Sequence, residues 1–226
     1  MLKFLFSPAY TINNLLQKTV RKFLNPALTT LDVGCGEAEI SQAFTQRSLY
    51  YGIDVETRLD ESVAEQINFR IYDGKYMPFD NETFDQLLSM EVIEHVDDLD
   101  LLITEMNRVL KNRGKVIITV PFMWPEHEMP HDYRRLTGNG LAGLMEKHGF
   151  KTEKIIKLGS APILTILCID LRIRLRSVTG KYISYVVISP LVVACNLLSY
   201  FRVGDGSCYS NVVYVGKKND PSHRRR

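Results

Sequence analysis

The chain has 226 residues, 45% of them hydrophobic and 24% charged, which is the composition of a globular protein with enough apolar material for a core. Its net charge of +2 is unevenly divided, because residues 158–226 hold 10 Lys and Arg against 3 Asp and Glu and so favour an anionic partner. The four cysteines lack Cys-x-x-Cys spacing, and the N-terminal apolar run is too short for a signal peptide. These features argue against a zinc site and export, and they predict a cytoplasmic protein with no bound metal.

Helix-like and strand-like segments alternate along the first half of the chain. Residues 11–24 place apolar side chains at helical spacing, and Asn25-Pro26 ends that run. Five apolar segments then read as buried parallel strands, at residues 29–33, 49–55, 69–73, 84–90 and 114–120. A helix is expected between the last two of them, closed by Gly114. The alternation predicts an α/β fold, an open and mostly parallel sheet with helices on both faces.

The second half continues the pattern and then departs from it. A further helix is expected at 136–150, ending at Gly149, and strands are expected at 151–158 and 210–218. Between these two strands lies an apolar insertion of different character. We therefore divide the chain into an N-terminal helix (1–24), a main domain (25–158 plus 208–218), the insertion (159–207) and a basic tail (219–226).

The sequence LDVGCGEAEI, residues 31–40, combines a buried strand, a glycine turn and an expected helix start. Glycine at 34 and 36 lets backbone amides approach a ligand without obstruction by a Cβ atom, and a helix N-terminus would favour polar or anionic groups. Asp54 ends the second strand, where a carboxylate can accept hydrogen bonds from both hydroxyls of a ribose. The alternative is a tight strand-to-helix turn that binds nothing.

Further motifs follow in a specific order: Asp73-Gly74 ends the third strand and SMEVIEHV (89–96) follows the fourth. With the D-V-G-C-G loop, this order resembles the class I S-adenosylmethionine-dependent methyltransferases, in particular the type 11-like group. The resemblance implies a Rossmann-like sheet of seven strands, the last antiparallel and inserted beside the fifth. Ala38 stands where a dinucleotide fingerprint has its third glycine, which argues against an NAD-dependent oxidoreductase.

The resemblance also implies a cofactor, S-adenosyl-L-methionine, and residues that hold it. The methionine moiety would lie against Asp32, Gly34 and Gly36, the ribose on Asp54, the adenine near Asp73 and Gly74, and the reactive methyl group beside Met90 and Glu91. Glu94 and His95 would contact the substrate. For this last pair, anchoring a helix start beside the site is an equal alternative.

Residues 121–137, PFMWPEHEMPHDYRRLT, follow the fifth strand and therefore emerge at the ligand edge of the sheet. Alone, the cluster of histidines and acids suggests a metal site or a hydrolase. At this edge it suggests the acceptor side of a transfer reaction, with His127 or His131 as general base and Asp132 orienting it. Alternatively, Asp132 and its neighbours pin the loop, with Thr137 as N-cap of the next helix.

Three more residues of this loop are candidates for substrate binding. Arg134 and Arg135 could hold a phosphate or carboxylate through paired hydrogen bonds, with Tyr133 beside them. Tyr133 and Arg134 could instead serve only to fix the loop. The whole phrase resembles a loop of bacterial methyltransferases associated with cell-surface glycan assembly. No nucleic-acid partner is expected, because no Asn/Asp-Pro-Pro-Tyr segment follows the fourth strand.

The insertion contains twenty uncharged residues, 182–201, with Pro190 at the middle. A shorter apolar run and the basic segment 170–176 precede it. We interpret it as a hairpin that dips into one leaflet of an anionic membrane, which would place the protein on the inner face of the membrane. The alternatives are a buried helical pair, a dimer interface, or a hairpin that spans the bilayer.

The sequence thus favours a methyltransferase that acts on a small-molecule, glycan or lipid-linked acceptor, most simply at oxygen. A second hypothesis is a soluble small-molecule methyltransferase whose insertion forms a dimer interface. A third is a cofactor-binding regulatory module without catalysis.

Overall fold

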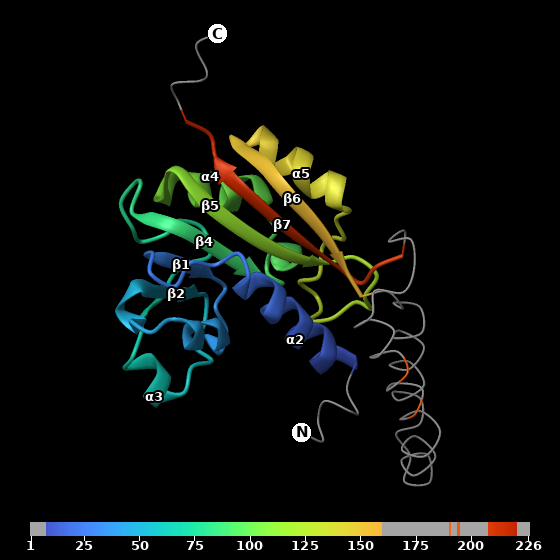
Figure 1. Ribbon diagram of the computed structural model, residues 1–226, viewed down its shortest axis with the longest axis horizontal. Coiled ribbons are helices and arrows are strands. Elements are labelled where there is room, and N and C mark those ends of the chain that lie inside the picture. Colours follow the sequence, from blue (N-terminus) through green and yellow to red (C-terminus); the bar gives the residue numbers. More distant parts are fainter. Residues whose placement is uncertain (1–7, 160–189, 191–193, 195–207, 221–226) are drawn as a thin grey trace.

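The computed structural model describes residues 8–159, 190, 194 and 208–220. Seven strands form one sheet in the order β3-β2-β1-β4-β5-β7-β6 (Figure 1). The strands are β1 (Thr30–Val33), β2 (Tyr50–Asp54), β3 (Asn68–Ile71), β4 (Phe84–Met90), β5 (Leu110–Pro121), β6 (Phe150–Leu158) and β7 (Asn211–Lys218).

The first five strands pair in parallel, and β7 lies antiparallel between β5 and β6. This arrangement confirms the expected seven-stranded α/β sheet with an antiparallel last strand beside the fifth. Because β7 is antiparallel to both neighbours, β6 runs in the same direction as β5. Asn211 therefore starts β7 opposite both Pro121 and Leu158, at the carboxyl edge of the parallel strands.

Helices cover both faces of the sheet (Figure 1). Helix α2 (Pro8–Arg21) lies on one face, and α4 (Leu99–Val109) and α5 (Gly138–Lys147) lie on the other. The remaining helical segments are short: η1 (Glu39–Ala43), η2 (Arg47–Leu49), α3 (Glu61–Ala64) and η3 (Ile93–His95). The molecule thus has three layers, with the site-bearing loops at one edge of the middle layer.

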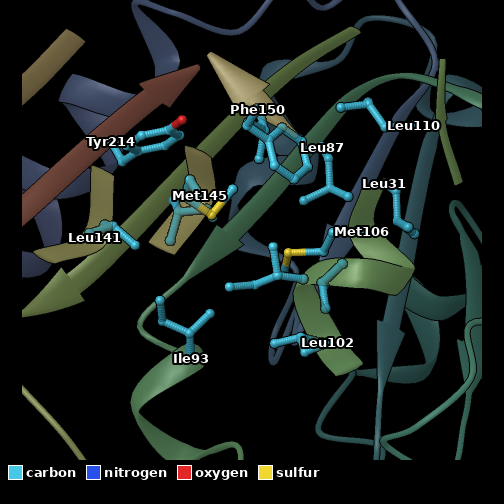
Figure 2. Close-up of a cluster of buried hydrophobic side chains, with 14 of the residues drawn as sticks. Leu31, Leu87, Ile93, Leu102, Met106, Leu110, Leu141, Met145, Phe150 and Tyr214 are labelled. Atoms are coloured by element: carbon cyan, nitrogen blue, oxygen red, sulfur yellow. The ribbon is translucent and has the colours of Figure 1, made fainter. Parts of the chain in front are cut away.

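Strict alternation along the central strands builds a core on each face. In β7, Val212 and Tyr214 join the cluster under α4 and α5, whereas Val213 and Val215 join the cluster under α2. Successive side chains of a strand point to opposite faces, so a strand covered on both sides must be apolar throughout. Figure 2 shows the first cluster, where Met106 of α4 and Met145 of α5 meet side chains from the sheet.

Two expectations about helix ends are confirmed. Thr137 caps α5, since its side chain accepts a hydrogen bond from the Gly140 amide at 3.0 Å. Helix α5 ends at Lys147, and Gly149 follows in the left-handed region with φ +84°.

Two other expectations are wrong. Gly114 does not close α4, which ends at Val109, because the carbonyls of Arg108 and Val109 accept hydrogen bonds from the Glu82 and Thr83 amides instead of from a further helical turn. The glycine loop leads into the short 3₁₀ helix η1 rather than an α-helix, after Ala38 turns left-handed with φ +53°. The loop therefore lacks the aligned dipole of a long helix.

The basic tail beyond Asp220 and most of the insertion, residues 160–207 apart from 190 and 194, lie outside the described residues. Within the part of the chain that is described, no helix is both long and apolar enough to cross a membrane.

Burial in the first cluster makes a direct prediction about stability. Ile118 of β5 is fully buried, whereas Ile71 of β3 is 58% exposed. We expect Ile118→Ala to lower the free energy of unfolding by about 2–5 kcal/mol, because it leaves a cavity. The matched change Ile71→Ala should cost less than about 1 kcal/mol. Urea unfolding followed by circular dichroism measures both, and equal losses would contradict the assigned sheet faces.

Candidate active site

The glycine loop after β1 requires glycine at one position and opens into free space at the other. A Cβ at Gly34, where φ is +70°, would lie 2.5 Å from Val92 Cγ2. A Cβ at Gly36, where φ is +51°, would meet none of the described atoms within 4 Å. Gly36 therefore leaves the backbone open to a ligand, as the sequence predicts for this loop.

A pocket of about 560 Å³ opens at the carboxyl ends of β1, β2 and β4, a size ordinary for a small-molecule site. Acids dominate its lining. Among the described residues around it, one arginine, Arg58, stands against six acids: Asp32, Glu37, Glu39, Asp54, Glu91 and Glu128. The pocket therefore favours a cationic ligand over an anionic one.

Asp32 is buried in β1 and accepts a hydrogen bond from the Tyr50 hydroxyl. Burial raises the pKa of Asp32 to about 7, the hydrogen bond from Tyr50 opposes that rise, and the charge of Asp54 adds to it. Asp54 accepts hydrogen bonds from the amides of Gly36 at 2.9 Å and Val55 at 2.7 Å. These contacts join the end of β2 to the glycine loop.

The two residues expected near an adenine are placed differently. Gly74 lines the pocket, with Tyr72 beside it. The Asp73 carboxylate accepts hydrogen bonds from the amides of Lys75 at 2.8 Å and Tyr76 at 3.0 Å, and these bonds lower the pKa of Asp73. Asp73 thus shapes the turn that presents Gly74.

Met90 and Glu91 leave the end of β4 and both line the pocket. The Glu91 carboxylate is held from two sides, by the Thr119 hydroxyl at 2.7 Å and the Asn211 amide at 2.8 Å. Burial raises the pKa of Glu91. Nothing in the sequence pattern singled out Thr119 or Asn211, which meet Glu91 only because β5 and β7 lie side by side.

Glu94 and His95 belong to η3, the short helix that follows β4. The Glu94 side chain is 1% exposed, and neither carboxylate oxygen has a hydrogen-bond partner among the described residues. Burial and the charge of Glu91 raise the pKa of Glu94. His95 lines the pocket, its Nδ1 lies 2.8 Å from the His131 carbonyl oxygen, and its Nε2 lies 3.6 Å from Glu94 Oε1.

The loop 121–137 holds His127 next to His95, with ring centroids 4.8 Å apart. His127 Nδ1 lies 3.2 Å from Asp132 Oδ2, and the same oxygen accepts a hydrogen bond from the His127 amide at 2.9 Å. The fully buried Asp132 carboxylate is paired with both terminal nitrogens of Arg135, and that pairing holds the pKa of Asp132 well below its usual range. Asp132 is therefore ionised and fixed where it can orient His127.

The remaining loop candidates face other partners. Arg134 donates hydrogen bonds to the carbonyls of three residues around η3, Ile93, Val96 and Asp97. His131 is exposed, with Nδ1 2.9 Å from the Tyr133 hydroxyl, and Tyr133 donates its own amide to the Glu94 carbonyl. This geometry favours the loop-fixing alternative for Arg134.

Two lining residues escaped the sequence reasoning. Arg58 and Glu128 face each other across the pocket, with Arg58 Nη1 3.7 Å from Glu128 Oε1. They lie seventy residues apart in the sequence, and neither was among the predicted site residues, although Glu128 belongs to the loop 121–137. Glu128 Oε2 lies 4.0 Å from His95 Nε2.

Comparison with known proteins gives this geometry its context. Residues 31–118 match the family described as "Methyltransferase domain". Phosphoethanolamine N-methyltransferase 2 of Caenorhabditis elegans is 27% identical over 117 residues, 46% of this chain and 26% of that protein. A ubiquinone biosynthesis O-methyltransferase of Pelagibacter ubique is 31% identical over 97 residues, 39% of this chain and 40% of that protein. The chain thus spans less than half the length of these curated relatives.

Among solved structures, the (4+2)-cyclase SpnF superposes with a TM-score of 0.62 at 17% identity, covering 90% of this chain and 80% of that one. At this identity the likeness establishes the fold alone, and the fold carries more than one chemistry. The matched family and the curated methyltransferases that share it are more specific than the fold. Residues 31–118 of this chain are therefore similar to a methyltransferase domain, and the curated relatives that share it include an N-methyltransferase and an O-methyltransferase.

Proposed function

We propose that the protein transfers a methyl group from S-adenosylmethionine to a small-molecule, glycan or lipid-linked acceptor at a hydroxyl oxygen. The acid-lined pocket carries this proposal. S-adenosylmethionine bears a sulfonium and an ammonium cation. The excess of six acids over one arginine in the lining favours a ligand with such cations. NAD bears two phosphate anions, which the same lining disfavours.

The residues of the pocket fit the cofactor in size and chemistry. The open backbone at Gly36 leaves room for its methionine moiety, and Asp54 ends β2 where a ribose would lie. The cofactor supplies a methyl group already activated by the sulfonium. The chain has only to position the acceptor and take its proton.

The side chains that would take this proton belong to the loop 121–137. His127, oriented by the ionised Asp132, and the exposed His131 are the candidates. The His127 ring lies against His95 at the pocket wall, whereas His131 contacts His95 through its backbone carbonyl. The acceptor oxygen would lose its proton to one of these imidazoles and keep the electron pair that forms the new bond to carbon. Arg135 supports this arrangement through Asp132 rather than by direct contact with the acceptor.

A lipid-linked acceptor is supported by where the insertion begins and ends. Leu158 and Ser210 lie at the carboxyl edge of the sheet, and the Ser210 amide donates a hydrogen bond to the Leu158 carbonyl at 2.9 Å. Both ends of the insertion therefore meet at the edge that carries the pocket. An apolar segment attached there would bring the site to a membrane surface.

Calorimetry with S-adenosylmethionine and with NAD tests the cofactor. We expect one equivalent of S-adenosylmethionine to bind and NAD not to bind. Gly36→Ala places a methyl group in the ligand space and should weaken binding about 10-fold, or about 1.4 kcal/mol. The control Gly143→Ala, on the exposed surface of α5, should leave the affinity unchanged. Absence of S-adenosylmethionine binding would overturn the proposed function.

Single replacements His127→Ala and His131→Ala test the base. Loss of a general base should lower turnover about 100-fold or more, while the affinity for S-adenosylmethionine stays unchanged. S-adenosylhomocysteine formed in the presence of a glycan and lipid extract measures turnover. His148→Ala, in which the lost imidazole contacts Asp100 away from the pocket, serves as the control. Full turnover in both variants would contradict a general base in this loop and would favour a purely structural role for it.

Flotation with vesicles tests the lipid-facing proposal. We expect the chain to bind vesicles that contain phosphatidylglycerol more than vesicles of phosphatidylcholine alone. Deletion of residues 160–206 should abolish binding, and the proximity of Leu158 to Ser210 lets a short turn close the gap without moving β6 or β7. If the deleted chain floats as the full chain does, the insertion does not serve as a membrane contact.

A further inference from the structure

Three potential metal ligands converge where the loop 121–137 meets η3. Glu94, His95 and His127 each offer one ligand atom, and these atoms lie within 4.8 Å of one another. His95 also lines the cofactor pocket. The cluster therefore lies on the acceptor side of the site, next to the space that the methyl group would enter.

The Glu94 carboxylate carries the argument that this cluster binds a cation. Its two oxygens are buried without a hydrogen bond in the described structure, and the neighbouring His95 Nε2 is 3.6 Å away. An isolated buried carboxylate is strongly unfavourable unless a cation or a proton compensates it. A metal ion coordinated at Oε1 would supply that compensation.

Both histidines are held in the orientation that metal-binding imidazoles need. His95 Nδ1 lies 2.8 Å from the His131 carbonyl oxygen, so this nitrogen carries the proton and Nε2 keeps its lone pair. His127 Nδ1 lies 3.2 Å from Asp132 Oδ2 and 3.3 Å from the Pro125 carbonyl oxygen, which has the same effect. A carboxylate or carbonyl behind each imidazole is the usual second layer of a metal site.

We propose that Glu94, His95 and His127 bind one divalent transition-metal ion, with zinc as the representative case, and leave one coordination position open toward the cofactor pocket. Two imidazoles and one carboxylate with an open position are a typical catalytic zinc set. Zinc bonds of about 2.0–2.2 Å place tetrahedral ligands about 3.4 Å apart. The ligand atoms would therefore move closer together by up to about 1.4 Å when the ion binds.

This inference rests on the proposed function and sharpens it. An acceptor hydroxyl bound at the open position would have a lowered pKa, so its proton would leave to water while its electron pair stays on oxygen. That pair would form the new O–C bond to the methyl group as the C–S bond breaks, and S-adenosylhomocysteine would leave with the electron pair on sulfur. His127 then acts as a ligand instead of a base, and Asp132 orients it in either role. The acceptor class becomes one whose hydroxyl can coordinate a metal ion.

Metal titration of the full, tag-free chain after treatment with a chelator tests the proposal. We expect one equivalent of Zn²⁺ by calorimetry, and visible absorption bands when Co²⁺ takes its place. Glu94→Gln, His95→Ala and His127→Ala should each weaken binding by at least the roughly 10–100-fold known for loss of an outer partner. His148→Ala should bind as the unchanged chain does.

Two results would overturn the site. One is no metal binding by the unchanged chain, and the other is metal binding by all three variants with the affinity of the unchanged chain. Glu94→Gln preserves the size of the side chain, and circular dichroism confirms that each variant is folded. S-adenosylmethionine calorimetry on the same samples separates the two proposals. Cofactor binding without metal binding removes only the metal site, whereas metal binding without cofactor binding removes the proposed function and leaves the metal site standing.

Discussion

Four carboxylates gather at the carboxyl edge of the sheet, and the burial of three of them, Asp32, Glu91 and Glu94, determines what can bind there. Asp32 and Asp54 come from β1 and β2, and Glu91 and Glu94 follow β4. Burial raises the pKa of Asp32 to about 7 and raises the pKa of both glutamates, so their negative charge is costly in the absence of a cation. A sulfonium on the cofactor side and a metal ion on the acceptor side both meet this constraint.

The buried acids also affect which kind of ligand the glycine loop can bind. Glycines between a strand and a helix often hold a phosphate at the helix N-terminus. Here the left-handed Ala38 and the short η1 stand in place of that helix. The Gly36 amide already donates a hydrogen bond to the Asp54 carboxylate. The loop is thus suited to a ligand that offers cations and hydroxyl groups, and a pyrophosphate would meet acids instead of an aligned dipole.

Much of the fold could be predicted because local patterns and the final packing agree. Residues 84–90 were expected as a strand and form β4 without change, and Val212 to Val215 alternate between the two cores as a doubly covered strand requires. The prediction that Gly114 ends α4 was wrong, because residues distant in the sequence determine where this helix ends. The amides of Glu82 and Thr83 take carbonyls that would otherwise extend the helix.

Some residues of the candidate site could likewise be predicted from the sequence, and others could not. Gly34 and Gly36 were predictable, since a turn at a strand end needs particular backbone angles. Tyr50 and Asn211 were not, since each reaches its carboxylate only across neighbouring strands. The convergence of Glu94 and His127 was equally hard to predict, because helix α4, strand β5 and part of the loop separate them in the sequence.

Several polar side chains of the loop 121–137 hold the site in place by contacts within the protein itself. Arg134 binds the carbonyls around η3 and so fixes the segment that carries Glu94 and His95. Arg135 fixes Asp132, which in turn fixes His127. The two arginines that first suggested a phosphate site thus act on the geometry of the three proposed ligands. A conservative Arg-to-Lys change would not preserve it, because a single ammonium group cannot hold two carbonyls or both oxygens of a carboxylate in one plane.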